Sequence, residues 1–399
     1  MSTVTHTGPG TAGRQATHRP RLVGVELALT FTTEFASLTS FVVLVSVLPM
    51  LAAASGAGGM AAGLITGALL AGTVLAETIS ACAIRRLGYR AVLATGALLL
   101  GAPTLALLPR EPEAVMVAVS LVRGLGFGLC GVAAGALAAI LLPPERRGEG
   151  LGLLGVVSGI PAIIGLPAGV WLAGHHQATV AVAIAAVAGL APLAVVRWLP
   201  SGRPAAQPDG GARPTGAGRA SRLALIFAAC TVAAGIIDSF LPLARQVPTG
   251  TASAALLVQS VADTVSRWQA GRQGDRHGHA RLLIPAVVAC ALGLAVLIWL
   301  ASPAAVLAGL ALFGAGFGVV ENSTFALLLD RLPEDRASAL WNLAYDAGYG
   351  AGPVMFGLVS AHTGYPAGFA VTGLLVLAAV PAALRERRAG AGRARLARR

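Results

Sequence analysis

Charged side chains are rare inside the long apolar stretches of the sequence. One arginine and six acids among them are the first candidates for chemistry: Arg123, Glu34, Glu77, Asp238, Asp263, Glu321 and Asp346. A charge in apolar surroundings is costly unless it is paired or faces water. A carboxyl group that alternates between an apolar environment and the neighbourhood of an arginine changes its affinity for protons. These residues therefore predict proton chemistry.

Two spacings suggest how some of these groups are used. Asn342, Tyr345, Asp346 and Tyr349 recur at helical spacing, so they share one face of a helix. We expect this polar stripe, together with Glu321, to face a substrate cavity; hydrogen bonding between helices explains the stripe equally well. Asp263 and Arg267 are four residues apart, which favours a structural ion pair within one helix.

The composition explains why these charges stand out. The chain of 399 residues is 56% hydrophobic and only 12% charged. A soluble domain usually has about 25% charged residues. The bilayer is the solvent that removes the need for a charged surface, so the composition excludes a soluble enzyme and predicts an all-α membrane protein.

The net charge of +12 does not indicate a nucleic-acid partner. All 29 basic residues are arginines, and they lie in short segments between apolar runs rather than on an aromatic-rich basic face. The four cysteines lie in apolar stretches without paired spacing, and His175–His176 and His277–His279 lack a third ligand. We therefore expect no disulfide, no metal site, no cofactor and no catalytic residue.

A hydrocarbon core of about 30 Å requires about 20 apolar residues for one helical crossing. By that measure the chain holds twelve candidate spans: 22–50, 58–84, 91–108, 114–141, 151–173, 178–198, 222–243, 251–270, 282–301, 304–329, 337–361 and 366–384. Twenty-five arginines then lie on one face and two, Arg110 and Arg245, on the other. Because arginine accumulates on the cytoplasmic side, both termini are predicted to be cytoplasmic.

The spans form two halves of six. Residues 1–21 are predicted to be a cytosolic tail, 22–198 an N-terminal bundle, 199–221 a Pro/Gly/Arg-rich cytosolic linker, 222–384 a C-terminal bundle and 385–399 a basic cytosolic tail. Motifs of the first half recur about 190 residues later, as Gly124–Gly128 does in Gly314–Gly318. Two halves related by duplication are typical of secondary transporters, in which the substrate site lies between the halves.

With these features, residues 22–384 resemble a twelve-helix transporter of the major facilitator superfamily. The family's cytoplasmic motif, Gly-x-x-x-Asp-Arg-x-Gly, is matched in the second half by Gly271, Asp275, Arg276 and Gly278. The resemblance implies that these residues gate the transporter by locking adjacent helix ends in one conformer. In the first half Arg85 stands where the acid belongs, so that copy of the lock is altered.

The resemblance also implies roles for the charges inside the spans. Arg123, followed by a glycine-rich stretch, is similar to the family's fourth-helix motif, which is associated with proton coupling. Because spans 1 and 4 line the cavity in this family, Glu34 is its expected partner, with Asp238 in span 7 as a second proton site. Residues 158–169 are partly similar to the glycine–proline motif of drug/proton antiporters, although a plain helix kink explains them equally well.

The expected function is therefore proton-coupled efflux of a small organic molecule or drug by alternating access, powered by the proton gradient. The expected partners are substrate, protons and lipid, for a monomer in the plasma membrane. A proton-coupled importer of a nutrient or metabolite is the main alternative. A membrane-embedded transferase, which would need clustered His or Asp in an interfacial loop, is a remote one, because the loops are short and their charges lie mostly on one face.

Overall fold

The computed structural model describes residues 24–54, 59–107, 112–142, 147–201 and 217–396, and this part of the chain is helical without any strand. The predicted N-terminal tail and most of the linker lie outside these residues. The first half contains α1 Val25–Ala54, α2 Gly59–Leu87, α3 Tyr89–Gly101, η1 Ala102–Leu107, α4 Glu113–Leu141, α5 Arg147–Gly174, α6 Ala178–Leu190, α7 Pro192–Val195 and η3 Val196–Trp198.

The second half repeats this alternation of long helices and short extensions. It contains α8 Ala217–Phe240, η4 Leu241–Leu243, α9 Thr249–His277, η5 His279–Arg281, α10 Leu283–Val296, η6 Leu297–Trp299, α11 Pro303–Leu329, α12 Glu334–Thr363, α13 Tyr365–Leu377 and α14 Val380–Leu396. The helix α14 therefore continues into the predicted C-terminal tail. It does so because Glu386 is buried against Arg222 at 3.0 Å and Arg331 at 2.6 Å.

Ten helical segments of the described residues are long and apolar enough to cross a membrane, against the twelve predicted. The two predicted spans that do not meet this measure, 251–270 and 337–361, lie in α9 and α12. These helices are 29 and 30 residues long, so their length suffices. Their polar residues lower the mean hydropathy, which means that α9 and α12 need protein or water on part of their surface.

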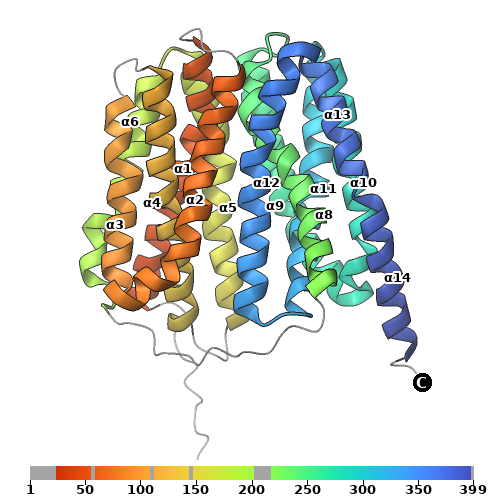
Figure 1. The fold of residues 1–399 in the computed structure, drawn as a ribbon, viewed down its shortest axis with the longest axis horizontal. Helices are drawn as coiled ribbons and strands as arrows, with labels where there is room; N and C mark the ends of the chain where they lie inside the picture. The colour runs from red at the N-terminus through yellow and green to blue at the C-terminus, as the bar shows by residue number, and fades with distance from the viewer. Residues whose placement is uncertain (1–23, 55–58, 108–111, 143–146, 202–216, 397–399) are drawn as a thin grey trace, which may run out of the picture.

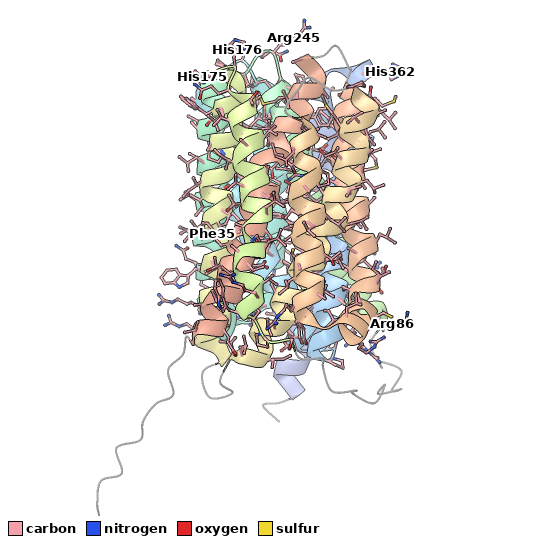
Figure 2. All side chains as sticks on the ribbon, turned by 90° about the vertical axis from the view of Figure 1, so that its left-hand side faces the viewer. Phe35, Arg86, His175, His176, Arg245 and His362 are labelled. Carbon is pink, nitrogen blue, oxygen red and sulfur yellow. The ribbon has the colours of Figure 1, made fainter. Side chains whose placement is uncertain are left out.

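The long helices run roughly parallel to one another, with α1–α6 on one side of the molecule and α8–α14 on the other (Figure 1). His175, His176, Arg245 and His362 lie at one end of the bundle, and Arg86 lies at the opposite end (Figure 2). We call these the His175 end and the Arg86 end. Phe35 points outward from the side of the bundle, as expected for a residue in contact with lipid.

Within each half, small residues allow two helices to touch through their backbones. A side chain at Gly124 of α4 would collide with the Leu69 carbonyl of α2. A side chain at Gly314 of α11 would collide in the same way with the Gln259 carbonyl of α9. Both members of the second contact lie 190 positions after those of the first, so the repeat in the sequence is also a repeat in packing.

The two halves meet mainly along two seams, α2 with α12 and α5 with α9. The first seam begins at the His175 end, where Gly63 of α2 lies against the Pro353 backbone of α12. In the second seam the Ser253 hydroxyl donates a hydrogen bond of 2.7 Å to the Pro167 carbonyl. Further toward the Arg86 end, Gly159 still lies near Thr264. The seams thus reach from the His175 end to about the middle of the helices.

Candidate functional site

The carboxyl group of Asp238 lies near the middle of the molecule, close to the C-terminal end of α8. Its side chain is only 4% exposed. The Tyr349 hydroxyl of α12 donates to one carboxylate oxygen at 2.6 Å, and the Gln259 amide of α9 donates to the other at 3.4 Å. The Ser46 hydroxyl of α1 also donates to the Asp238 backbone carbonyl at 2.5 Å. Asp238 therefore joins three helices of the second half to α1 of the first.

A second group of charges lies between α9 and α11. Arg267 approaches Glu321 at 3.3 Å between Nη1 and Oε2, and Glu321 is 5% exposed. Asp263 lies within side-chain hydrogen-bonding reach of Glu321. The expected ion pair within α9 between Asp263 and Arg267 is thus wrong in this structure: Arg267 pairs across to α11, because the close α9–α11 packing brings Glu321 into reach.

Arg267 faces the interior of the protein although its side chain is 46% exposed. The exposed apolar residues Val261, Val265 and Trp268 mark the outward face of α9. At 100° per residue, Arg267 lies about 120° around the helix from that face. Arg267 therefore lies away from the face of α9 that these apolar residues mark.

Aromatic rings line the side of α12 that faces α8 and α11. Trp341, Tyr345 and Tyr349 stack in sequence, with ring centroids 5.9 and 5.6 Å apart. Phe227 of α8 stacks on Trp341 at 4.5 Å. The helical spacing in the sequence indicated the two tyrosines but not Trp341, Phe227 or Gln259. For Trp341, its position four residues before Tyr345 was an available signal.

The predicted polar stripe of α12 has two kinds of neighbour. Asn342 is exposed and lies on the face opposite the outward apolar residues of α12. Tyr349 and Asp346 are buried: Tyr349 donates to Asp238, and Asp346 lies within hydrogen-bonding reach of Glu77 of α2. For these two residues the structure thus shows contacts between helices, which was the alternative to a substrate-facing stripe.

Arg123 of α4 is fully buried inside the first half. Its guanidinium donates to the Thr104 hydroxyl of η1 at 3.0 Å and to the Ser40 carbonyl of α1 at 2.8 Å. The expected ion pair with Glu34 is not formed. Ser40 lies six residues beyond Glu34, which places the two about 9 Å apart along the α1 axis.

Glu34 also lacks a hydrogen-bond partner for its buried Oε2 atom within the described residues. The hydroxyl groups of Ser37 and Ser40, further along α1, are likewise buried without a partner there. The first half therefore holds an acid and an arginine on neighbouring helices that do not meet in this conformation.

The predicted gating segment is helical for most of its length. The helix α9 continues to His277, so Gly271 and Arg276 lie in its last turns, and the chain turns at Gly278, where φ is +88°. A positive φ is easily adopted only by glycine. The side chain of Asp275 lies outside the described residues.

In chemical terms the second half is an acidic site. Glu321 and Asp263 lie beside one arginine, Arg267, and Asp238 is near enough to Asp263 to interact with it electrostatically, so the group can hold protons or a cationic ligand beside aromatic rings. No cluster of three potential metal ligands occurs among the described residues.

Comparison with known structures gives matches over nearly the whole chain. A peptide transporter, POT, in complex with sulfate has a TM-score of 0.75 at 15% identity, covering 92% of this chain and 97% of its own. The nucleoside transporter NupG has a TM-score of 0.72 at 13% identity, covering 91% and 99%. Identities this low show a shared fold.

Comparison with curated proteins gives no match. The sequence profile of the Major Facilitator Superfamily matches residues 30–339 and again residues 250–399. Together these matches cover nearly all the described residues. The chain is therefore a multi-pass membrane transporter that belongs to the Major Facilitator Superfamily, and it is not an enzyme.

Proposed function

We propose that this protein is a proton-coupled secondary transporter that exports a small organic molecule across the plasma membrane by alternating access. The observation that carries the proposal is the group of acids in the second half, in which Glu321 and Asp263 lie beside Arg267 and Asp238 is bonded to Tyr349. Such groups inside a membrane are expensive and mark the paths of substrates or protons.

The proposed topology has twelve transmembrane helices in two pseudo-symmetric bundles of six. The repeated glycine contacts at an offset of 190 residues support it. We count α9 and α12 among the spans because their polar sides face the other helices and the proposed opening between the halves. Lipid then contacts only their apolar faces. This arrangement places the substrate between the halves.

The proposed orientation has both termini and the Arg86 end in the cytoplasm, in accordance with the arginine distribution. The contacts between the halves then close the outer side, and the exposed Arg267 and Asn342 adjoin an opening toward the cytoplasm. In this interpretation the structure is an inward-open state. One chain supplies both halves, so a monomer suffices.

In the proposed cycle Asp238, and in turn Glu34, takes up a proton from outside and releases it inside. Substrate competes with the proton at the acidic site, where Asn342, Tyr345, Asp346, Tyr349 and Glu321 contribute to the cavity. Arg123 takes part in coupling if α1 shifts along α4 during the cycle and brings Glu34 to it. The gate is formed by Gly271, Asp275, Arg276 and Gly278 at the end of α9.

The test uses inverted membrane vesicles that contain the full chain, with the interior acidified. The probes are monocationic aromatic dyes, nucleosides and dipeptides, each in a separate arm. Export predicts that at least one probe accumulates inside the vesicles and is released by a protonophore. Vesicles that contain the Asp238→Asn variant are the matched control and should accumulate none.

Import on the same scaffold predicts the opposite result. A probe that accumulates in whole cells under an inward proton gradient, and not in inverted vesicles, would overturn the proposed direction. Transport that persists unchanged without a proton gradient and in the Asp238→Asn variant would overturn proton coupling itself.

A further inference from the structure

One acid inside the spans has no part in the site described above. Glu77 lies on α2, in the first half, and its carboxyl group lies within hydrogen-bonding reach of Asp346 on α12, in the second half. Asp346 is 6% exposed. The contact therefore joins the two halves through two acids.

The seam between α2 and α12 explains why these acids meet. The helices run in opposite directions, with Gly59 against Gly357 and, further along α2, Gly67 against Gly350. Helical side chains lean toward the N-terminus of their own helix. Glu77 thus leans toward the His175 end and Asp346 toward the Arg86 end, so that the two carboxyl groups approach each other at the inner limit of the seam.

Two carboxylates in contact repel each other, and such a pair persists when it shares a proton. We propose that Glu77 and Asp346 form a proton-binding site between the halves, which holds α2 against α12 while it is protonated and releases them when the proton is lost. The proton leaves to water through Glu77, which is the less buried of the two. Two negative charges then remain and push the helices apart.

No other charge of the described residues takes over this role. In the middle part of the elements that pack against α2 and α12, the acids, arginines and tyrosines are Glu34 of α1, Arg123 of α4, Asp238 of α8, Glu321 of α11, and Tyr345 and Tyr349 of α12. The other titratable groups of these elements are cysteines or lie near helix ends, as Arg85, Arg86 and Glu113 do. Arg123 is bonded to Thr104 and Ser40, and Asp238 to Tyr349. The ion pairs found in the described part of the chain lie elsewhere, so no arginine there neutralises the two acids.

The site can be tested without substrate or gradient, by double electron–electron resonance on the full chain in detergent or nanodiscs. The labels are introduced by Met60→Cys on α2 and Leu358→Cys on α12, two exposed positions at the His175 end of the seam. Cys82, the partly exposed cysteine among the described residues, is replaced by serine in this chain, since Cys130, Cys230 and Cys290 are buried. We expect a short label distance at pH 5 that shifts to a longer one at pH 9.

In the Glu77→Gln variant the amide donates to the Asp346 carboxylate without needing a proton, so we expect the short distance at both pH values. The Glu77→Gln/Asp346→Asn double variant should behave in the same way. Glu113→Gln, which removes an exposed acid of α4, should keep the shift of the parent chain. An unchanged distance in the parent chain, or a full shift in both seam variants, would overturn the inference. Because no transport is measured, these outcomes are independent of the proposed export.

Discussion

The two halves place opposite charges at equivalent positions. Glu77 of α2 and Arg267 of α9 are separated by 190 residues, the same interval that relates Gly124 to Gly314. Glu77 reaches out of its own half to α12, whereas Arg267 stays within its half and pairs with Glu321 of α11. The same relative position thus makes a contact with the neighbouring half in one case and belongs to a charged site within its own half in the other.

The two arginines inside the spans differ as well. Arg123 is fully buried and bonds to a hydroxyl and a backbone carbonyl, with no acid beside it. Arg267 is half exposed and stands beside two acids. An arginine without a counter-charge lowers stability, whereas an arginine that balances acids supports it. The following predictions test this difference.

The largest effect is expected for Arg267→Met, which leaves Asp263 and Glu321 without their counter-charge. Transport should be lost, and stability should fall by about 2–3 kcal/mol, less than for a fully buried pair because Arg267 is half exposed. Thermal unfolding in detergent checks the stability. The Arg267→Met/Glu321→Gln double variant should regain most of it; if it does not, the pairing is not what Arg267 provides.

Arg123→Met should also abolish proton-driven transport, but with a different effect on stability. Since no acid is left unpaired, the free energy of unfolding should stay the same or rise, within about 1 kcal/mol of the parent chain. The same unfolding assay measures it. A large loss of stability would show that both arginines are structural and would remove the contrast between the halves.

Asp238→Asn should reduce proton-driven transport by about tenfold or more, equivalent to about 1.4 kcal/mol. The amide still bonds to Tyr349 but cannot exchange a proton. Substrate exchange in the absence of a gradient should persist, and both rates are measured on the same proteoliposomes. Equal loss of both rates would indicate that Asp238 binds substrate and does not couple protons.

The gating motif offers a matched pair of variants, because the second half has Asp275 where the first half has Arg85. Asp275→Asn should slow turnover severalfold with little change in substrate affinity. Arg85→Gln should have a smaller effect, since that copy of the motif lacks the acid. Transport rates measure turnover, and the thermal shift caused by a bound ligand measures affinity. A pure loss of affinity in Asp275→Asn would contradict gating.

The smallest effect is expected for Tyr349→Phe, which removes one hydrogen bond to Asp238 at about 1 kcal/mol. Transport should fall by a few-fold while the stacked ring stays in place. Tyr345→Phe is the control, because its ring stacks in the same column. If both variants behave alike, the bond from Tyr349 to Asp238 has no special role.

The sequence alone determined that this protein lies in a lipid bilayer, that it is helical and which family it resembles. Scarcity of charge and the length of the apolar runs leave few folds open, because a bilayer admits a chain only if the backbone bonds internally. The repeat at 190 residues was also readable, since glycines that allow close helix contacts recur at fixed spacing. The charged residues inside the spans could also be recognised in the sequence, because charge is rare in the apolar stretches around them.

Only the tertiary structure decided which of these charges meet. Helical spacing suggested the pair Asp263–Arg267 and the family resemblance the pair Glu34–Arg123, yet Arg267 pairs with Glu321 and Arg123 bonds to Thr104 and Ser40. Sequence spacing reports neighbours on one helix, whereas partners on different helices depend on rotation and on shifts along the axis. The contact between Glu77 and Asp346 depends on the register of α2 against α12, which no local pattern encodes.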